Sequence, residues 1–419
     1  MPPPETPIDR RRFWRIVGSG AAFQGGAAAV DSATVVASIV HLLTGSVFAV
    51  GFASAALRLG WLLPQLVVGY LAERAERRMP FYVFGAYGRA TCAALIALLL
   101  WLGNEWSGAV LATGFLVLWV AYAFVSGVVA VPYNDIVGRS ILPAARSRLL
   151  AWRFFIGGLL ALGIAAVLRL TLDVLPTLNA YALIFALGAA LMLISSTFFV
   201  SAGEPPVPNG APGPRSRQSV GAFLRGGRDT LRDDARFRQF LYAQWFGGTA
   251  LMALPFYVVA ATGQGIGAAA VGTLLGAQTA GSLLSNAAWG WLGDRAGKLR
   301  LLQAVAIVRM APPLLVLFLL ATGAGVWAFA ALFFVIGAMM NGTTIGYLGY
   351  LMEISPDDRR PAYSAYFNTL VSPAALLPLL GAALISLASI EAVFVAAAGG
   401  AVMQLVLLNR IANRDRRSA

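Results

Sequence analysis

The stretch Gly290-Trp-Leu-Gly-Asp294-Arg295-Ala-Gly297-Lys298 decides the fold of this chain. A diverged copy lies 221 positions earlier and reads Gly69-Tyr-Leu-Ala-Glu73-Arg74-Ala-Glu76-Arg77-Arg78. Each copy ends one long apolar run and is followed directly by another. A charged hairpin between two apolar segments, repeated after about half the chain length, indicates a duplicated membrane protein.

The composition supports a protein that crosses a bilayer many times. Of the 419 residues, 59% are hydrophobic and only 12% are charged, whereas soluble domains carry about 25% charged residues. One span needs roughly 20 apolar residues, and the runs are continuous, which favours helices over a barrel. We therefore predict an all-α membrane protein with twelve transmembrane helices, approximately at 14–42, 46–72, 81–103, 107–132, 150–172, 180–202, 238–261, 267–292, 300–322, 325–352, 362–386 and 390–410.

The basic residues indicate the orientation of these spans. The net charge is +13, and 27 of the 31 Lys and Arg residues fall in the tails and gaps on the side of the N-terminus. This asymmetry follows the positive-inside rule, so we expect both termini to be cytoplasmic. It also explains the basicity without a nucleic-acid partner. Arginine greatly outnumbers lysine and alanine is abundant, as in GC-rich bacterial genomes, so we expect a bacterial inner (plasma) membrane.

One long internal gap divides the twelve spans six and six. It opens with several prolines, as linkers do. Its later part predicts an amphipathic helix at the inner membrane surface. The apolar residues of that helix are Phe223, Leu224, Leu231, Phe237 and Phe240. The predicted organisation is a tail (1–13), a six-helix bundle (14–202), a linker (203–237), a second bundle (238–410) and a tail (411–419).

Further features recur between the halves. Pro143-Ala-Ala-Arg146 corresponds to Pro356-Asp-Asp-Arg359, and Arg89 and Arg309 follow the two hairpin acids by 16 and 15 residues. The halves are therefore predicted to be parallel six-helix bundles with a solute site between them near the membrane midplane. The matching positions of Arg89 and Arg309 favour a shared structural role.

The chain resembles the major facilitator superfamily (MFS). The hairpin pattern Gly-x-x-x-Asp-Arg-x-Gly-[Arg/Lys], between spans 2 and 3 and again between spans 8 and 9, is typical of that family. The resemblance implies secondary active transport by alternating access of two rocking bundles. We expect a monomer whose partners are a small-molecule substrate, protons and membrane lipid.

The hairpin residues are candidates for a gating latch. Glycines allow close helix approach, an acid can interact with the positive end of a neighbouring helix, and the basic residues can bind headgroups or acids. The same residues could instead only determine topology. The gating candidates are Gly69, Glu73, Arg74, Arg78, Gly290, Asp294, Arg295, Gly297 and Lys298.

Two charged residues lie deep within adjacent predicted spans. Asp31 and Arg58 are each roughly 20 Å from the external turn near Thr44, at 1.5 Å per residue, so they can lie at similar depth. Charges in a span are functional candidates. One hypothesis is that Asp31 exchanges a proton while Arg58 tunes its pKa, since a neighbouring charge and burial both shift a carboxyl pKa. The alternatives are a static buried pair and direct binding of an anionic substrate by Arg58.

Polar residues in the spans that line the path in this family are candidates for the substrate cavity. Amides and phenols suit hydroxylated or zwitterionic solutes, but they could equally join neighbouring helices through hydrogen bonds. The candidates are Gln24, Tyr122, Ser126, Gln244, Tyr257, Gln278, Asn286, Asn341, Tyr347 and Asn368.

The sequence offers no sign of an enzyme. His41 and Cys92 are the only residues of their kinds, and no metal-binding or phosphate-binding motif occurs, so we expect no cofactor, metal or catalytic site. Span 5 lacks the proline-containing pattern common in antiporters of the family. This favours proton-coupled symport for uptake over proton-coupled efflux of drugs or metabolites. A non-transporting sensor or assembly protein on the same scaffold is the alternative from another class, and a lipid flippase is a further one.

Overall fold

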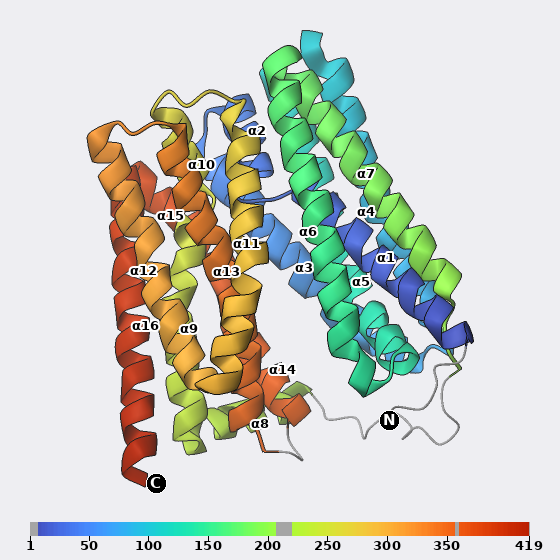
Figure 1. Ribbon diagram of the computed structural model, residues 1–419, viewed down its shortest axis with the longest axis vertical. Coiled ribbons are helices and arrows are strands. Elements are labelled where there is room, and N and C mark those ends of the chain that lie inside the picture. Colours follow the sequence, from blue (N-terminus) through green and yellow to red (C-terminus); the bar gives the residue numbers. More distant parts are fainter. Residues whose placement is uncertain (1–6, 207–219, 357–359, 419) are drawn as a thin grey trace. The chain divides into compact units, whose positions relative to one another are not determined.

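The computed structural model describes residues 7–206, 220–356 and 360–418, and nearly all of them are helical (Figure 1). The chain divides into two units. The first comprises residues 1–215 with 267–276, and the second comprises 216–266 with 277–419. Each unit is a helical bundle with its own core.

The first unit contains seven complete α-helices and the first residues of α11 (Ala270–Arg295) among the residues that the structure describes. α4 packs against α5 and α7, α3 packs against α5, and α1 packs against α6 and α7. Large aromatic side chains such as Phe115, Trp119, Tyr181 and Phe185 fill its interior. The helices are α1 (Pro7–Ala29), α2 (Val35–Thr44), α3 (Val47–Arg74), α4 (Met79–Leu102), α5 (Gly108–Ser140), α6 (Pro143–Val174) and α7 (Thr177–Ala202), with a 3-10 turn η1 (Gly103–Glu105).

The second unit has a comparable set of helices. α9 packs against α16 and α15, and α12 packs against α13 and α16. Phe237, Phe240, Tyr350 and Phe367 lie in its core. The helices are α8 (Val220–Asp233), α9 (Ala235–Ala253), α10 (Phe256–Gly263), α11 (Ala270–Arg295), α12 (Lys298–Thr322), α13 (Val326–Ile354), α14 (Arg360–Val371), α15 (Leu377–Leu387) and α16 (Ile390–Ser418), with η2 (Ser372–Leu376).

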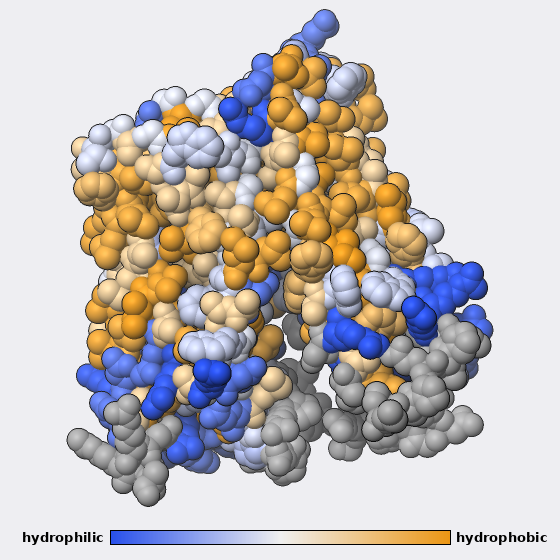
Figure 2. Space-filling model, in the orientation of Figure 1, coloured by the Kyte–Doolittle hydropathy of each residue, from blue (hydrophilic) through white to orange (hydrophobic). Residues whose placement is uncertain are grey.

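The twelve-helix membrane architecture is confirmed. Ten helical segments among the described residues are long and apolar enough to cross a bilayer. The two remaining predicted spans correspond to α1 with α2 and to α11. Figure 2 shows apolar side chains along the sides of the bundles, with many of the hydrophilic ones gathered at the lower end of the view. Exposed Leu, Phe and Trp side chains on most of these helices fit contact with lipid.

Three of the predicted spans are not continuous helices. The first span breaks between α1 and α2, the seventh breaks between α9 and α10 beside Pro255, and the eleventh contains η2 with Pro373. Prolines within a span predict such interruptions, and Pro255 and Pro373 each lie at a break. The break between α1 and α2 contains no proline, and hydropathy does not reveal it. Pro312 and Pro313, predicted to interrupt a span, lie inside the continuous helix α12. Non-helical backbone is tolerated at this depth only where protein or a cavity surrounds it.

Close helix contacts occur at glycines other than those of the hairpin. A Cβ on Gly127 would lie 2.3 Å from the Gly60 carbonyl oxygen, and a Cβ on Gly337 would lie 1.9 Å from that of Gln278. α3 and α5 therefore touch backbone to backbone, and so do α11 and α13. At Gly69 and Gly290 a Cβ would meet no described atom within 4 Å. The close approach predicted at these two glycines is not found.

The amphipathic linker helix forms, but it is shorter than predicted. α8 ends at Asp233, and Asp234 caps the start of α9 by accepting a hydrogen bond from the backbone N–H of Phe237 at 2.9 Å. Phe237 and Phe240 therefore belong to α9 and are buried in the bundle core, which corrects their assignment to a membrane-surface helix. Leu231 packs against the same core. The side chains of Phe223 and Leu224 lie outside the described residues.

Candidate functional site

Asp31 lies at the break in the first span. Its Oδ1 accepts hydrogen bonds from the backbone N–H of Ala33 at 3.1 Å, from that of Thr34 at 2.9 Å, and from the Thr34 hydroxyl at 2.8 Å. These bonds satisfy N–H groups that the start of α2 would otherwise leave unpaired. The expectation that Asp31 lies within a continuous helix was wrong, and the carboxylate instead holds the break together.

Arg58 of α3 lies within electrostatic range of this carboxylate. The charge of Asp31 acts on the partly buried Arg58 guanidinium, so the two charges predicted to lie at similar depth are close in the structure. The Nε of Arg58 is buried without a hydrogen-bond partner among the described residues. The arrangement places a titratable acid, a fixed cation and a discontinuous helix together inside a membrane-spanning bundle.

The substrate-cavity candidates of the first unit contact different helices and do not all converge on one another. Gln24 packs against Gly157 of α6. Tyr122 is buried, stacks on Trp119 with ring centroids 5.0 Å apart, and directs its hydroxyl toward Met192. Ser126 lies one turn further along α5 and is partly buried. The structure does not bring these three side chains into one hydrogen-bonded network.

The candidates of the second unit mostly join helices to one another. Asn341 donates to Asn286 at 3.1 Å, and Tyr347 donates to Asn368 at 2.8 Å. Gln244 accepts from Gln404 at 3.1 Å. These contacts match the interhelical hydrogen bonds that the sequence left open as an alternative to substrate contact. Tyr257 is buried and stacks on Phe394, and Gln278 is also buried.

The second hairpin copy has a tight turn. Only two residues separate α11 from α12, and Gly297 adopts φ +86°, a conformation nearly restricted to glycine. Lys298 pairs with the exposed Asp294 at 3.4 Å, and Arg295 lies over the Trp291 ring. Asp294 pairs only with a neighbour in its own hairpin among the described contacts. Its role in a gating latch therefore remains a prediction.

The turn of the first hairpin copy is longer and has a different structure. Four residues separate α3 from α4, and Glu76 replaces the second glycine. Glu204, from the segment after α7, accepts hydrogen bonds from the backbone N–H groups of Arg78 at 3.0 Å and Met79 at 2.9 Å. It thereby caps the start of α4. The side chains of Glu73 and Arg74 lie outside the described residues.

Glu204 also belongs to an ionic network that the sequence did not indicate. Arg139 contacts Glu204 at 2.8 Å and Asp135 at 2.6 Å, and Arg78 lies 3.7 Å from Asp135. Burial would raise the pKa of Glu204, but the hydrogen bonds from Arg139, Arg78 and Met79 outweigh it, and the pKa lies below its ordinary value. The only sequence signal was an acid placed directly between a span and the proline-rich linker.

The repeat-related arginines differ in their surroundings. Arg309 is buried and donates to the neutral side chains of Gln404 and Thr343, with Thr343 bonded at 2.5 Å. A side chain on Gly247 would collide with this network. Arg89 is equally buried, yet its guanidinium lies over the Phe23 ring at 4.2 Å and makes no hydrogen bond to any described residue. The shared structural role predicted for the pair fits Arg309 alone.

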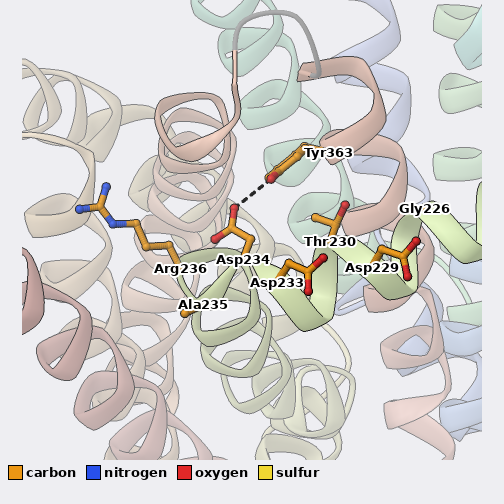
Figure 3. A pocket seen from close by; sticks show the side chains of 8 residues that line it. All are labelled: Gly226, Asp229, Thr230, Asp233, Asp234, Ala235, Arg236 and Tyr363. Atoms are coloured by element: carbon orange, nitrogen blue, oxygen red, sulfur yellow. Dashed lines mark hydrogen bonds between the residues drawn. The ribbon is translucent and has the colours of Figure 1, made fainter.

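A depression of about 490 Å³ lies where α8 meets α9 and α14 (Figure 3). The Tyr363 hydroxyl donates to Asp234 at 2.9 Å across it, while Asp229, Asp233 and Arg236 line its exposed rim. Asp234 also caps α9. The depression therefore marks the junction between the linker helix and the bundle. No group of three acids, His or Cys residues suited to a metal ion occurs in the part of the chain that the structure describes.

Comparison with known proteins gives a family match over part of the chain and solved structures that share its fold. A family model described as Major Facilitator Superfamily matches residues 243–418. A search of curated proteins finds no match.

Solved structures share the fold over nearly the whole chain. A point mutant of the nucleoside transporter NupG is 12% identical, with a TM-score of 0.70, covering 96% of this chain and 99% of its own. A bacterial homologue of the iron transporter ferroportin in the inward-facing state is 11% identical, with a TM-score of 0.71 and coverages of 96% and 98%. A point mutant of the E. coli fucose:proton symporter FucP is 16% identical, with a TM-score of 0.58 and coverages of 95% and 98%.

Proposed function

We propose that the chain is a member of the major facilitator superfamily, whose model matches residues 243–418, and that it is a secondary active transporter that takes up a small solute together with protons. One observation carries the proton coupling: Asp31 lies at a break in a membrane-spanning helix with Arg58 beside it. Discontinuous helices near the midplane are where transporters of this kind bind substrates and coupling ions. An acid at this depth is costly unless it has a function or a partner.

The contacts of Asp31 link its protonation to the shape of the helix break. As a carboxylate, Asp31 accepts three hydrogen bonds through one oxygen, and hydrogen bonds to a charged acceptor are the stronger kind. Protonation removes the charge that strengthens these bonds and that attracts Arg58. A proton arriving at Asp31 would therefore loosen the break and free Arg58, which is the coupling that alternating access requires.

The uptake direction has support from α6. This helix runs unbroken from Pro143 to Val174, and it carries Gly157, Gly158 and Gly163 without the internal proline common in antiporters of the family. Efflux of drugs or metabolites in exchange for protons is the alternative mode. A sensor that transports nothing would not need a titratable pair inside the bundle, so Asp31 and Arg58 disfavour it.

The test is uptake into proteoliposomes across a panel of radiolabelled solutes, with and without an imposed pH gradient. Solutes that raise the unfolding temperature of the purified protein would select the panel. We expect accumulation above equilibrium only with the gradient. Asp31→Asn keeps an oxygen that can cap α2 but cannot titrate, so it should retain substrate counterflow and lose gradient-driven accumulation.

Asp31→Ala is the matched variant. It removes both the cap and the charge, so it should lose coupling and also lose about 0.5–2 kcal/mol of stability through the missing cap. Full gradient-driven accumulation by Asp31→Asn would rule out the coupling role. Absence of transport for every stabilising solute would favour the sensor alternative.

A further inference from the structure

Two arginines inside the first unit have donors that the protein leaves unused. Arg89 of α4 is 5% exposed and makes no hydrogen bond to a described residue. Arg153 of α6 donates to the Tyr133 hydroxyl at 3.1 Å, while its Nε is buried without a partner. A guanidinium carries five N–H donors, so most donors of this pair have no acceptor among the described residues.

The two guanidiniums belong to one cluster. Arg89 and Arg153 are close enough for their charges to act on each other, and the phenol groups of Tyr82, Tyr122 and Tyr133 lie in the surroundings of Arg89. The Arg153 guanidinium lies 5.6 Å from the Tyr133 ring centroid, and the Tyr82 and Tyr133 rings stack at 6.4 Å. Phe23 covers the face of Arg89. Helices α1, α4, α5 and α6 thus surround two cations with aromatic rings and phenols.

No carboxylate of the described residues balances this charge. Among the described residues, no carboxylate forms an ion pair with Arg89 or with Arg153. Like charges repel each other, and a buried charge such as that of Arg89 is normally paired. Arg153 is partly exposed. Arg309, at the matching place in the second unit, shows the structural solution: its terminal nitrogens bind neutral side chains. Arg89 has no such contacts.

The depth of the cluster suits a solute site. Arg89 is ten residues from the start of α4, so at 1.5 Å per residue it lies about 15 Å into that helix, near the middle of a hydrocarbon core of about 30 Å. Arg153 follows Arg148, where the membrane-spanning part of α6 begins, by five residues, so it lies about 8 Å into the span. Charged groups at this depth mark substrate or ion pathways.

We propose that Arg89 and Arg153 form a subsite for an oxyanion, the carboxylate or phosphate group of a small organic acid. Planar guanidiniums bind such groups through paired hydrogen bonds, and the surrounding rings suit an apolar or aromatic remainder. The identification of this anion as the transported substrate rests on the proposed function, whereas the binding itself does not.

The test measures the unfolding temperature of the purified full-length protein in detergent with three probes of similar size. Benzoate carries a carboxylate, phenyl phosphate carries a phosphate, and benzamide is neutral. We expect benzoate or phenyl phosphate to raise the unfolding temperature at millimolar concentration and benzamide to leave it unchanged. A response to only one of the two anions identifies which oxyanion the subsite takes.

Variants assign the effect to the cluster. Arg89→Gln and Arg153→Gln should each weaken the response at least about tenfold in probe concentration. Arg89→Lys keeps the charge but loses the planar guanidinium, so it should weaken anion binding and still fold. It replaces Arg89→Gln in the test if Arg89→Gln does not fold. Arg169→Gln, which removes an exposed arginine paired with Asp173, is the control and should respond as the natural protein does.

The proposal is overturned if neither anion raises the unfolding temperature or if benzamide raises it equally. It is also overturned if neither Arg89→Gln nor Arg153→Gln alters the response. The measurement needs neither a membrane nor a gradient. A chain that binds anions but does not transport would disprove the proposed function alone, and a chain that transports without anion binding would disprove this subsite alone.

Discussion

Glu204 connects three segments of the first unit through one carboxylate. It caps the start of α4 at Arg78 and Met79 and pairs with Arg139 near the end of α5. Helix N-termini favour negative charge because their first N–H groups point outward without partners. Glu204 therefore stabilises the turn of the first hairpin copy, which has Glu76 where the second copy has Gly297.

The stability contributed by Glu204 should depend on pH. Because its folded pKa lies below the ordinary value of 4.5, the charged form stabilises the fold above that value, and the contribution is lost as the pH falls through the lower folded pKa. Glu204→Gln keeps an acceptor but removes the charge. We expect it to cost about 1 kcal/mol at neutral pH, with the difference disappearing in acid.

Thermal unfolding of the purified variants, from neutral pH to below pH 4.5, would measure this dependence. Glu76→Gln is the control, because Glu76 is exposed in the same turn and should change stability little. A Glu204→Gln deficit of constant size across the pH range would show that the charge contributes nothing.

At the scale of elements, the hairpins and the broken spans show what sequence patterns can predict. Twelve apolar runs predicted nearly all of the helices, because a span must satisfy its backbone locally and therefore leaves a clear signal. The break at Asp31 left a weaker sequence signal. Asp31 precedes Thr34 by three residues, and β-branched residues follow; an acid in this position can cap a helix. The hydrophobicity of the surrounding run outweighed this capping signal in the prediction.

Side-chain partners were beyond prediction because they join residues distant in the chain. Gln404 binds Gln244 across 160 positions, and Glu204 binds Arg78 across 126. The sequence supplied candidates for such contacts but no means of pairing them. The proximity of Asp31 and Arg58 was predictable, since both lie at equal distance from one short turn.

Gly297 offers a test of the hairpin element. Its φ of +86° and ψ of 163° suit glycine, so Gly297→Ala should destabilise the protein by about 1–3 kcal/mol. Gly290→Ala is the matched control. Gly290 lies within α11 with open space around it, so alanine there should stabilise the helix by roughly 0.5–1 kcal/mol. Equal unfolding temperatures for Gly297→Ala and the natural protein would refute the strain argument.

At the scale of the whole molecule, the distribution of arginines predicts the orientation in the membrane. In a Cys92→Ala background, a cysteine replacing Glu105 between α4 and α5 should react with a membrane-impermeant maleimide on intact cells. A cysteine replacing Arg77, in the turn before α4, should react only after permeabilisation. The reverse pattern would place both termini outside the cytoplasm.

The two hairpins have a consequence for exchanging one half of the chain for the other. In the second half, Gly297 forms the turn before α12. In the first half, the start of α4 is capped by Glu204, which lies in the segment leading into the linker. The two halves are therefore not interchangeable. A chimera built from two second halves would need no acid at its midpoint, but one built from two first halves would require a second copy of Glu204 after its final span.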